Sequence, residues 1–372
     1  MNSAESFRIV VLPGDGIGVE VMDACLAALK ALQQSHRGFL LHFEPHAGGA
    51  ALYAASGTAF PEASMRACEA ADAVLFGAMG LPHVRYDDGT EIAPQLELRE
   101  HLELFAGVRP IRAIPGVPLP LADPRAAQID FVLVREQTEG WFYGRNHADA
   151  APRGDADTCY DLGRITRSGS ERLFEFSFRL AQHRRARNSA KGRVTCVDKA
   201  NVHRAMALMN RVFWEVAQRH PDIASDHCYV DAMALNLIRK PWDYDVVPTE
   251  NQFGDILSDL AAALVGGMGM APSGDIGERH ALFQPAHGSA PDIAGQGRAN
   301  PTAMLLSAAM MLEWLGERSG RPALTDAAAA LESAIDRIYA ERRVCPFEFG
   351  GQDGTAAITR AVIDALKQPV AA

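Results

Sequence analysis

Short runs of Val, Ile and Leu alternate with longer segments of helical periodicity along most of this 372-residue chain. A run of four or five apolar residues suits a strand buried on both faces, and the segments between the runs are long enough for crossover helices. The alternation therefore predicts an α/β fold with parallel strands covered by helices. We expect buried strands at residues 8–12, 73–76, 131–134, 194–197 and 246–247. We expect helices at residues 18–32, 61–70, 94–105, 171–186, 200–218, 254–265, 301–315 and 323–340.

Two segments rich in Pro or Gly divide the chain. Residues 110–124 contain several prolines and suit a linker that leaves a first domain, and the glycines of residues 266–270 suit a return to it. A chain that leaves a domain and comes back builds that domain from both ends. We expect a discontinuous first domain of residues 1–104 and 266–372, and a second domain of residues 105–265.

The bulk composition excludes several classes of protein. With 48% hydrophobic and 22% charged residues, the chain is typical of folded globular proteins. A net charge of −10 and the absence of a basic run argue against nucleic acid as a partner. No apolar stretch reaches the roughly 18 residues that span a bilayer. Residues 1–7 do not resemble a signal peptide, and the six cysteines form no C-x-x-C pair, so we expect a cytoplasmic protein without a membrane partner.

Acidic residues at the ends of predicted elements suggest a metal site. Asp255 and Asp259 are four residues apart on a predicted helix, which places both carboxylates on one face. Asp231 ends the strand-like run of residues 227–231, and Lys199 follows the strand at 194–197. Carboxylate oxygens are the ligands that hard divalent cations prefer. An i, i+4 acid pair alone is more often a solvated helix face, but three acids and a lysine at element ends indicate a site.

Two glycine-containing loops could bind a nucleotide. In residues 12–18 the glycines are Gly14, Gly16 and Gly18, whereas the Rossmann fingerprint needs its third glycine at position 19, so this loop supports only a tight turn. Residues 285–295 form a Gly-, Ser- and Pro-containing loop followed by a helix after Asn300. Its Asp292 could accept hydrogen bonds from a ribose diol and would repel a 2′-phosphate. Taken alone, this loop is as well explained by an ordinary turn.

Together these segments resemble the β-decarboxylating dehydrogenases, the isopropylmalate and isocitrate dehydrogenase family. The resemblance covers nearly the whole chain and implies that family's two-domain, non-Rossmann fold. Arg99 and Arg109, ten residues apart, match the family's paired arginines, with Val108 in place of the usual leucine, and Arg135 matches a third arginine. The other matching segments are residues 12–18, 197–202, 253–259, 287–295 and 350–355.

The resemblance implies an NAD-dependent oxidation of a 2-hydroxy diacid, followed by loss of carbon dioxide. Arg99, Arg109 and Arg135 would bind the substrate carboxylates, a bidentate task that suits guanidinium groups. Lys199, Asp231 and Tyr143 would be catalytic, with Lys199 relaying the hydroxyl proton. Mg²⁺ or Mn²⁺ would be bound by Asp231, Asp255 and Asp259 and would stabilise the charge on the ketone oxygen.

The same resemblance implies the cofactor and the assembly. A homodimer would share each active site, with Lys199 and Asp231 from one subunit and Asp255 and Asp259 from the other. The carboxylate of Asp292 and its neighbour Ile293 stand where NADP-dependent relatives carry Lys-Tyr, which implies NAD. The expected cofactor-binding residues are His287, Gly288, Ser289, Ala290, Asp292, Ile293, Asn300 and Asn201.

Two positions depart from the family pattern. Phe142 stands where the family has an acid tyrosine, and a phenyl ring cannot protonate an enol, so either the adjacent Tyr143 or a water takes that role, or turnover is impaired. In the specificity segment, Leu96 and Gln95 stand where isopropylmalate enzymes have two leucines, so Gln95 departs from that pattern, and the isocitrate pattern is not reproduced either. Gln95 hints at a small or polar substituent on the malate core.

We therefore weigh four functions. 3-Isopropylmalate is the default substrate by overall resemblance. D-malate or tartrate oxidation and isocitrate-type substrates are alternatives within the class. A regulatory paralogue that binds ligand but turns over slowly is the alternative outside it, favoured by Phe142 and opposed by the retention of Lys199 and the three aspartates.

Overall fold

The computed structural model describes residues 5–145, 147–151, 153–155 and 157–368. The chain forms two compact units. The described part of unit 1 lies in residues 5–102, 114–118 and 266–368, and unit 2 lies in residues 103–113 and 119–265. The predicted α/β class and the discontinuous first unit are confirmed.

Unit 1 contains a mixed sheet. Strand β1 pairs in parallel with β2 and β3, β3 pairs in parallel with β12, and β12 pairs antiparallel with β11. The β3 strand is buried along its full length, as its unbroken run of small and apolar residues predicts. The strands are β1 (Glu5–Gly14), β2 (Phe39–Pro45), β3 (Ala73–Ala78), β11 (Pro272–Ile276) and β12 (Ala281–Pro285).

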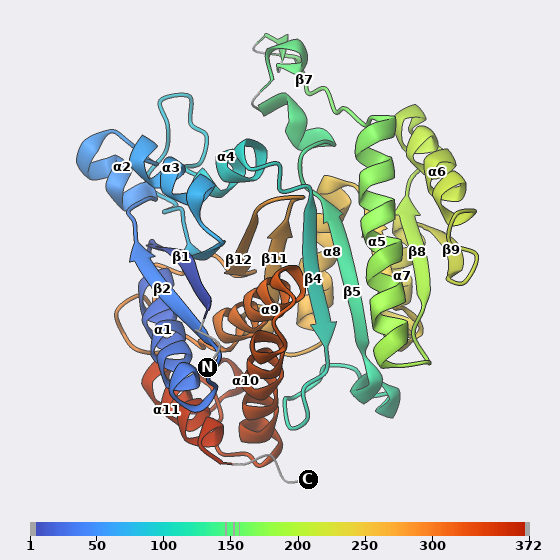
Figure 1. The fold of residues 1–372 in the computed structure, drawn as a ribbon. Helices are drawn as coiled ribbons and strands as arrows, with labels where there is room; N and C mark the ends of the chain where they lie inside the picture. The colour runs from blue at the N-terminus through green and yellow to red at the C-terminus, as the bar shows by residue number, and fades with distance from the viewer. Residues whose placement is uncertain (1–4, 146, 152, 156, 369–372) are drawn as a thin grey trace. The chain divides into compact units, whose positions relative to one another are not determined.

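The helices of unit 1 come from both ends of the chain. The α9 and α10 helices contact each other, and α1 packs beside α11 although they are more than 300 residues apart in sequence (Figure 1). The helices are α1 (Ile17–Ser35), α2 (Ala50–Ser56), α3 (Glu62–Ala70), α4 (Pro94–His101), α9 (Thr302–Ser319), α10 (Pro322–Ala340) and α11 (Thr355–Leu366). Short 3-10 turns, η5 (Met268–Met270) and η6 (Phe347–Phe349), lie in the C-terminal part.

Unit 2 is built on a second set of strands. The β5, β10, β8 and β9 strands pair in parallel in that order, and β4 pairs antiparallel with β5. The strands are β4 (Ala106–Arg112), β5 (Asp130–Glu136), β8 (Arg193–Asp198), β9 (Ala224–Tyr229) and β10 (Val246–Thr249), with a small ribbon of β6 (Arg153–Gly154) and β7 (Cys159–Tyr160). The helices and turns are α5 (Arg167–Arg187), α6 (Arg204–Ala217), α7 (Val230–Arg239), α8 (Asn251–Ala263), η1 (Pro124–Gln128), η2 (Trp141–Arg145), η3 (Ala148–Ala150) and η4 (Pro241–Asp243).

Helices cover both faces of these strands, with α5 and α6 on one face and α7 and α8 on the other (Figure 1). Phe131 and Leu133 of β5 belong to the core beneath α7 and α8. Because side chains alternate along a strand, Arg135 points to the same face as these two residues. The α8 helix therefore covers the face from which Arg135 projects.

Two expectations about this part of the chain need correction. The proline-containing segment at 110–124 was expected to be a linker throughout, and residues 114–118 do belong to unit 1, but its first three residues complete β4, where Val108 and Ile111 are buried beside β5. The strand before Asp231 ends at Tyr229, and Asp231 lies in the first turn of α7. An acidic residue is favoured there by the helix dipole. The 3.6-residue pattern of buried Met233 and Leu237 was the signal for this helix.

The expected strands and helices are otherwise present, with shifted ends. The helix expected to reach residue 105 ends at His101. Two residues later Glu103 has a φ of 52°, which is outside the range of a right-handed helix. The strands β2, β11 and β12 and the helices α2 and α11 were not predicted. In β2, Phe39 and Leu41 are buried and Leu40 between them is exposed. This alternation covers too few residues to predict a strand from the sequence. Among the described residues, no helix has the length and apolarity needed to cross a bilayer.

A buried carboxylate organises the first glycine turn of unit 1. Asp15 accepts hydrogen bonds from the backbone amides of Ala50 (2.7 Å), Ala51 (2.9 Å) and Gly80 (2.8 Å). It thereby supplies partners to amides at the start of α2, which have none within the helix. Gly16, with φ of 57°, lies so close to Ser289 that a Cβ would be 2.0 Å from its carbonyl oxygen. The glycine turn thus fixes α2 and the loop that contains Ser289.

We expect Asp15→Ala to lower the free energy of unfolding by about 2–3 kcal/mol, because it leaves buried amides without an acceptor. Urea unfolding followed by circular dichroism would measure the change. Asp326→Ala is the matched control, since Asp326 is exposed on α10, and we expect it to stay within about 0.5 kcal/mol of the parent. Equal effects of the two substitutions would contradict the role given to Asp15.

Candidate functional site

Two predicted substrate arginines project from one face of β4 and β5. Gly107 lies opposite Arg135 in the antiparallel register, and Arg109 lies opposite Leu133. Residues 107 and 109 share a face of β4, so Arg109 and Arg135 point to the same side of the strand pair. Both residues are buried, with exposed fractions of 6% and 4%. Two guanidinium groups are thereby held at neighbouring positions under α8.

The start of α8 fixes the orientation of Arg135. Arg135 Nε donates to Asn251 Oδ1 at 2.8 Å, and Arg135 Nη1 forms an ion pair with Asp255. At Gly254, an added Cβ would be 2.7 Å from the Arg135 Cβ. Asn251 and Gly254 were not predicted as functional residues. Their signal was the sequence Asn-x-x-Gly-Asp, in which the amide, the missing side chain and the acid fall on one helical face.

The two aspartates of α8 repel each other. Partial loss of hydration and the neighbouring Asp255 charge raise the pKa of Asp259 above its usual value, while Arg109 and Arg135 act to lower it. Asp259 nevertheless remains exposed in the single chain. A surface with two adjacent carboxylates and two arginines can attract both a cation and a dianion.

Lys199 and Asp231 form a second charged pair in unit 2. Lys199 follows β8, and its Nζ donates to Asp231 Oδ1 at 2.5 Å. This hydrogen bond from Lys199 lowers the pKa of Asp231 below its usual value, so Asp231 is ionised at neutral pH. The Asp231 side chain is 69% exposed and remains accessible to a ligand. Asn201, two residues after Lys199, is also exposed.

Phe142 and Tyr143 point toward different neighbours. The Phe142 ring lies near Arg135, with the guanidinium carbon 5.3 Å from the ring centroid. Tyr143 is buried, stacks on His147 at 3.7 Å between centroids, and its hydroxyl is 2.5 Å from an Arg164 nitrogen and 3.3 Å from Asp149. Phe142 therefore borders the predicted substrate arginine, whereas the Tyr143 hydroxyl is already hydrogen-bonded. The role of Tyr143 as the acid stays a prediction.

The α4 helix of unit 1 carries the third arginine and the specificity residues. Arg99 is buried and donates from Nε to Asp275 of β11 at 2.9 Å, and Asp275 also accepts from Gln284 of β12. Gln95 lies one turn before Arg99, and Leu96 is beside it, partly buried. Gln95 Oε1 is shielded from solvent and accepts no hydrogen bond from any described residue. An orphaned buried acceptor of this kind is expected where a ligand supplies the donor.

The predicted cofactor loop is also in unit 1. Ser289 is buried and donates to the Gly80 carbonyl at 2.5 Å, and its own carbonyl accepts from Ile17. His287 Nδ1 lies 2.9 Å from the Gly288 carbonyl, while burial lowers the pKa of the ring and leaves Nε2 with no partner among the described residues. Gly288 and Asp292 are exposed, and Ala290 and Ile293 are partly buried.

Asn300 follows this loop and is itself anchored. Its side-chain amide donates to Glu348 at 2.5 Å, and its oxygen accepts from the amide and hydroxyl of Thr302. Burial raises the pKa of Glu348, and the hydrogen bond from Asn300 acts in the opposite direction. Glu348 was not predicted as a neighbour of the loop, because it is nearly 50 residues away in sequence.

The predicted site residues therefore fall into groups within each unit. In unit 2, Arg109 and Arg135 lie with the two aspartates of α8, and Lys199 lies with Asp231. Within the described ranges of this single chain, no three His, Cys, Asp or Glu side chains gather closely enough to hold a metal. The expected metal site takes Asp231 from one subunit and the α8 aspartates from the other.

The two α8 aspartates should affect stability in opposite directions. In EDTA at pH 7, Asp259→Asn should raise the free energy of unfolding by up to about 1 kcal/mol, because it removes a carboxylate that is harder to ionise in the folded state. Well below the usual aspartate pKa of about 4 both states are protonated, so the gain should vanish there; it should grow as pH rises from that value to the raised folded-state pKa and be complete above it. Asp255→Asn should lower stability by about 1 kcal/mol, because buried Arg135 loses its partner. Urea unfolding at both pH values measures this, and destabilisation by Asp259→Asn at pH 7 would contradict the repulsion.

Comparisons with known proteins agree on one family. The family model described as isocitrate/isopropylmalate dehydrogenase matches residues 8–366. The 3-isopropylmalate dehydrogenase of Methanothermobacter thermautotrophicus is 40% identical over 352 residues, covering 94% of this chain and 96% of that relative. The 3-isopropylmalate/3-methylmalate dehydrogenase of Methanocaldococcus jannaschii is 38% identical over 362 residues, covering 97% and 99%.

Solved structures give the same result. The isocitrate dehydrogenase of Methylococcus capsulatus superposes with a TM-score of 0.84 at 33% identity, covering 97% of this chain and 100% of that one. A β-decarboxylating dehydrogenase of Thermococcus kodakarensis, in its apo form, gives a TM-score of 0.77 at 34% identity, covering 97% and 96%. The chain belongs to the isocitrate/isopropylmalate dehydrogenase family of oxidoreductases.

Proposed function

We propose that this protein is an NAD- and divalent-metal-dependent enzyme that oxidatively decarboxylates a 3-substituted malate such as 3-isopropylmalate. The observation that carries the proposal is the meeting of two buried arginines with two adjacent aspartates under the start of α8. Such a surface suits a dicarboxylate substrate together with a cation. Membership of the family supplies the reaction class.

The arginines bind and orient the substrate. Arg135 is held by Asn251 and Asp255, and Arg99 is held by Asp275, so each guanidinium keeps a fixed direction. Arg109 projects beside Arg135. A guanidinium that is already ordered loses little conformational entropy when it forms bidentate bonds to a carboxylate. The three arginines would thus fix the carboxylates relative to the carbon that is oxidised.

Lys199 would accept the proton of the substrate hydroxyl. Its Nζ donates to Asp231 at 2.5 Å in this chain, and a cation bound by Asp231 would take up that carboxylate and leave the amine free to accept the proton. Asp231, Asp255 and Asp259 would hold Mg²⁺ or Mn²⁺, because their carboxylate oxygens are the donors that such ions prefer, and a cation would relieve the repulsion between the two α8 carboxylates. The ion would supply positive charge next to the oxygen that becomes negative during decarboxylation.

The loop after β12 would bind NAD. His287 Nε2 is buried without a described partner, so a polar group of the cofactor would satisfy it. Gly288, Ser289, Ala290, Asp292, Ile293 and Asn300 would line the adenosine site, with Asn201 as a further contact. The exposed Asp292 favours a ribose diol and disfavours the extra phosphate of NADP.

A homodimer would complete each active site. Leu235 and Ile238 on α7 and Ile256 on α8 have exposed fractions of 54%, 47% and 61%. Large apolar side chains gathered on two adjacent helices are typical of an interface. Burying them against a second copy would bring Asp231 of one protomer toward the α8 aspartates of its partner. We assign the cofactor to a domain of residues 1–104 and 266–372, and the dimer and metal residues to a domain of residues 105–265.

Other substrates remain candidates. The buried, unpartnered Oε1 of Gln95 favours a small or polar substituent, as in D-malate or tartrate. An isocitrate-type substrate is a further alternative, and Phe142 favours a regulatory paralogue with slow turnover. The free state of all six cysteines suits a cytoplasmic enzyme without a nucleic-acid or membrane partner.

An assay of purified protein with Mn²⁺ and NAD tests the proposal. We expect NADH formation, followed by absorbance, with one or more of 3-isopropylmalate, D-malate, tartrate, isocitrate and homoisocitrate. Chelation of the metal should abolish it, and NADP should replace NAD poorly. Binding of NAD without turnover of any of these diacids would contradict the enzyme proposal and favour the regulatory alternative.

Variants at positions 142 and 143 would identify the acid. If Tyr143 protonates the enol, Tyr143→Phe should lower kcat by about 10²-fold or more with little change in KM. Phe142→Tyr should raise kcat if the missing hydroxyl limits turnover. An unchanged kcat in Tyr143→Phe would contradict the catalytic role of Tyr143 and leave water as the proton source.

A further inference from the structure

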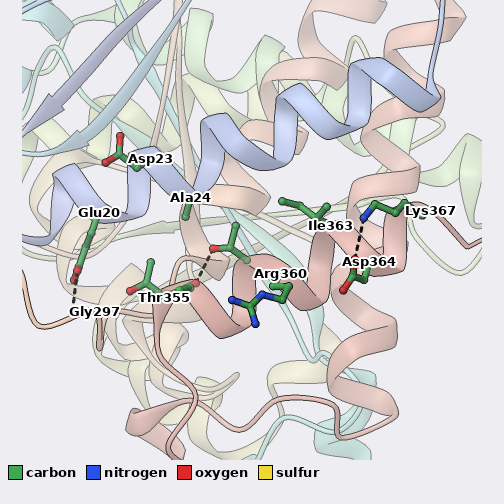
Figure 2. A pocket seen from close by; sticks show the side chains of 11 residues that line it. Glu20, Asp23, Ala24, Gly297, Thr355, Arg360, Ile363, Asp364 and Lys367 are labelled. Atoms are coloured by element: carbon green, nitrogen blue, oxygen red, sulfur yellow. Dashed lines mark hydrogen bonds and ion pairs between the residues drawn. The ribbon is translucent and has the colours of Figure 1, made fainter.

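A groove of about 510 Å³ lies between α1 and α11 in unit 1 (Figure 2). This volume is within the range of small-molecule sites. One wall carries Glu20, Asp23 and Ala24 of α1, and the other carries Arg360 and Ile363 of α11. None of these residues belongs to the proposed catalytic or cofactor sites. The groove also differs from those sites in having charges of both signs on opposite walls.

Among the described residues, two charged groups in the groove lack partners and a third is only partly satisfied. The Asp23 carboxylate and the Arg360 guanidinium form no hydrogen bond or ion pair with any residue that the structure describes. Glu20 Oε2 accepts from the Gly297 amide at 3.2 Å, but its Oε1 is buried and has no donor in the described part of the chain. By contrast, Lys367 at the end of the groove is paired with Asp364 at 3.0 Å.

Arg360 forms no ion pair with the carboxylates of Glu20 and Asp23. No nitrogen of Arg360 comes within 4.0 Å of a carboxylate oxygen of Glu20 or Asp23, although all three line the same groove. A buried carboxylate oxygen without a donor is costly, and the last torsion of a glutamate rotates easily, so Glu20 can turn its Oε1 toward a cation in the groove. The groove thus offers a place for a cation at α1 and for an anion at Arg360.

The space between the charged groups is apolar. The side chains of Ala24 and Ile363 lie along the groove between its two charged walls. A simple anion would leave the carboxylates of α1 without a partner and would be repelled by them. A dication would meet Arg360. A ligand with one ammonium group, one carboxylate and an aliphatic side chain satisfies all three features.

We propose that the groove between α1 and α11 binds an α-amino acid with an aliphatic side chain. Its ammonium group contacts Glu20 and Asp23, its carboxylate contacts Arg360, and its side chain packs on Ala24 and Ile363. This proposal does not depend on the proposed catalytic function, because binding can be measured without cofactor, metal or substrate.

Isothermal titration calorimetry of the purified full-length protein tests the zwitterion requirement. L-Leucine, L-valine and L-alanine are the probes, with 4-methylpentanoate as the analogue of leucine without the amine and 3-methylbutylamine as the analogue without the carboxylate. We expect saturable binding of at least one amino acid, and binding of each leucine analogue to be weaker than that of leucine by tenfold or more. Absence of binding by all three amino acids at 20 mM (roughly the limit for a weak, millimolar site), or equal affinity for 4-methylpentanoate, would overturn the proposal.

Matched variants locate the site. Arg360→Gln and Glu20→Gln should each weaken binding of the best amino acid by about tenfold or more, while Arg37→Gln, at an exposed arginine of unit 1 outside the groove, should not. Glutamine at position 20 keeps an acceptor for the Gly297 amide, and Arg360 has no described partner to lose, so both variants should keep the parent Tm. Binding unchanged in both groove variants would overturn the assignment. Asp23→Asn provides a third test, with weaker binding expected.

Discussion

The candidate site depends on the hydrogen bond and ion pair that the α8 helix forms with Arg135. Arg135 is 4% exposed, so its guanidinium needs fixed partners, and Asn251 and Asp255 provide them from one turn of helix. The absence of a side chain at Gly254 allows the helix to approach the strand closely enough for these contacts. The Arg135–Asp255 ion pair thus connects β5 to α8. It places a proposed substrate-binding arginine next to a proposed metal ligand.

This arrangement has a cost in stability. Asp255 is held by Arg135, whereas Asp259, one turn later, experiences the repulsion of Asp255 and a partial loss of hydration. Charges that are unfavourable in the folded chain and are relieved by a ligand are characteristic of functional sites. In unit 1, the buried Gln95 Oε1 and His287 Nε2, which have no partner among the described residues, follow the same principle. Each is a polar atom that a substrate or cofactor would satisfy.

Much of the fold, and the placement of some candidate site residues on their elements, was predicted from the sequence. The i, i+4 spacing predicted that Asp255 and Asp259 share a helix face, and apolar runs located strands such as β3 and β5. Tertiary contacts were not accessible, because a local pattern does not report them. The contact of Asn251 with Arg135 spans 116 positions in the sequence. Asp231 was expected to end a strand at residues 227–231, but the strand ends at Tyr229 and Asp231 lies in the helix that follows. The β4 strand was not predicted, because its sequence contains a proline and few apolar residues. It is buried because it pairs with β5.

We propose that one cation is bound by Asp231 of one protomer and by Asp255 and Asp259 of its partner. Mixing Asp231→Asn protein with Asp255→Asn protein, after unfolding and refolding them together, tests it most directly. Each variant alone should bind no Mn²⁺ with high affinity. In a mixed dimer, one of the two sites recovers all its aspartates, so a statistical mixture should regain roughly a quarter of the parent Mn²⁺ sites, as expected for a two-fold symmetric dimer. No recovery of Mn²⁺ binding, in mixtures shown to contain mixed dimers, would contradict a shared site.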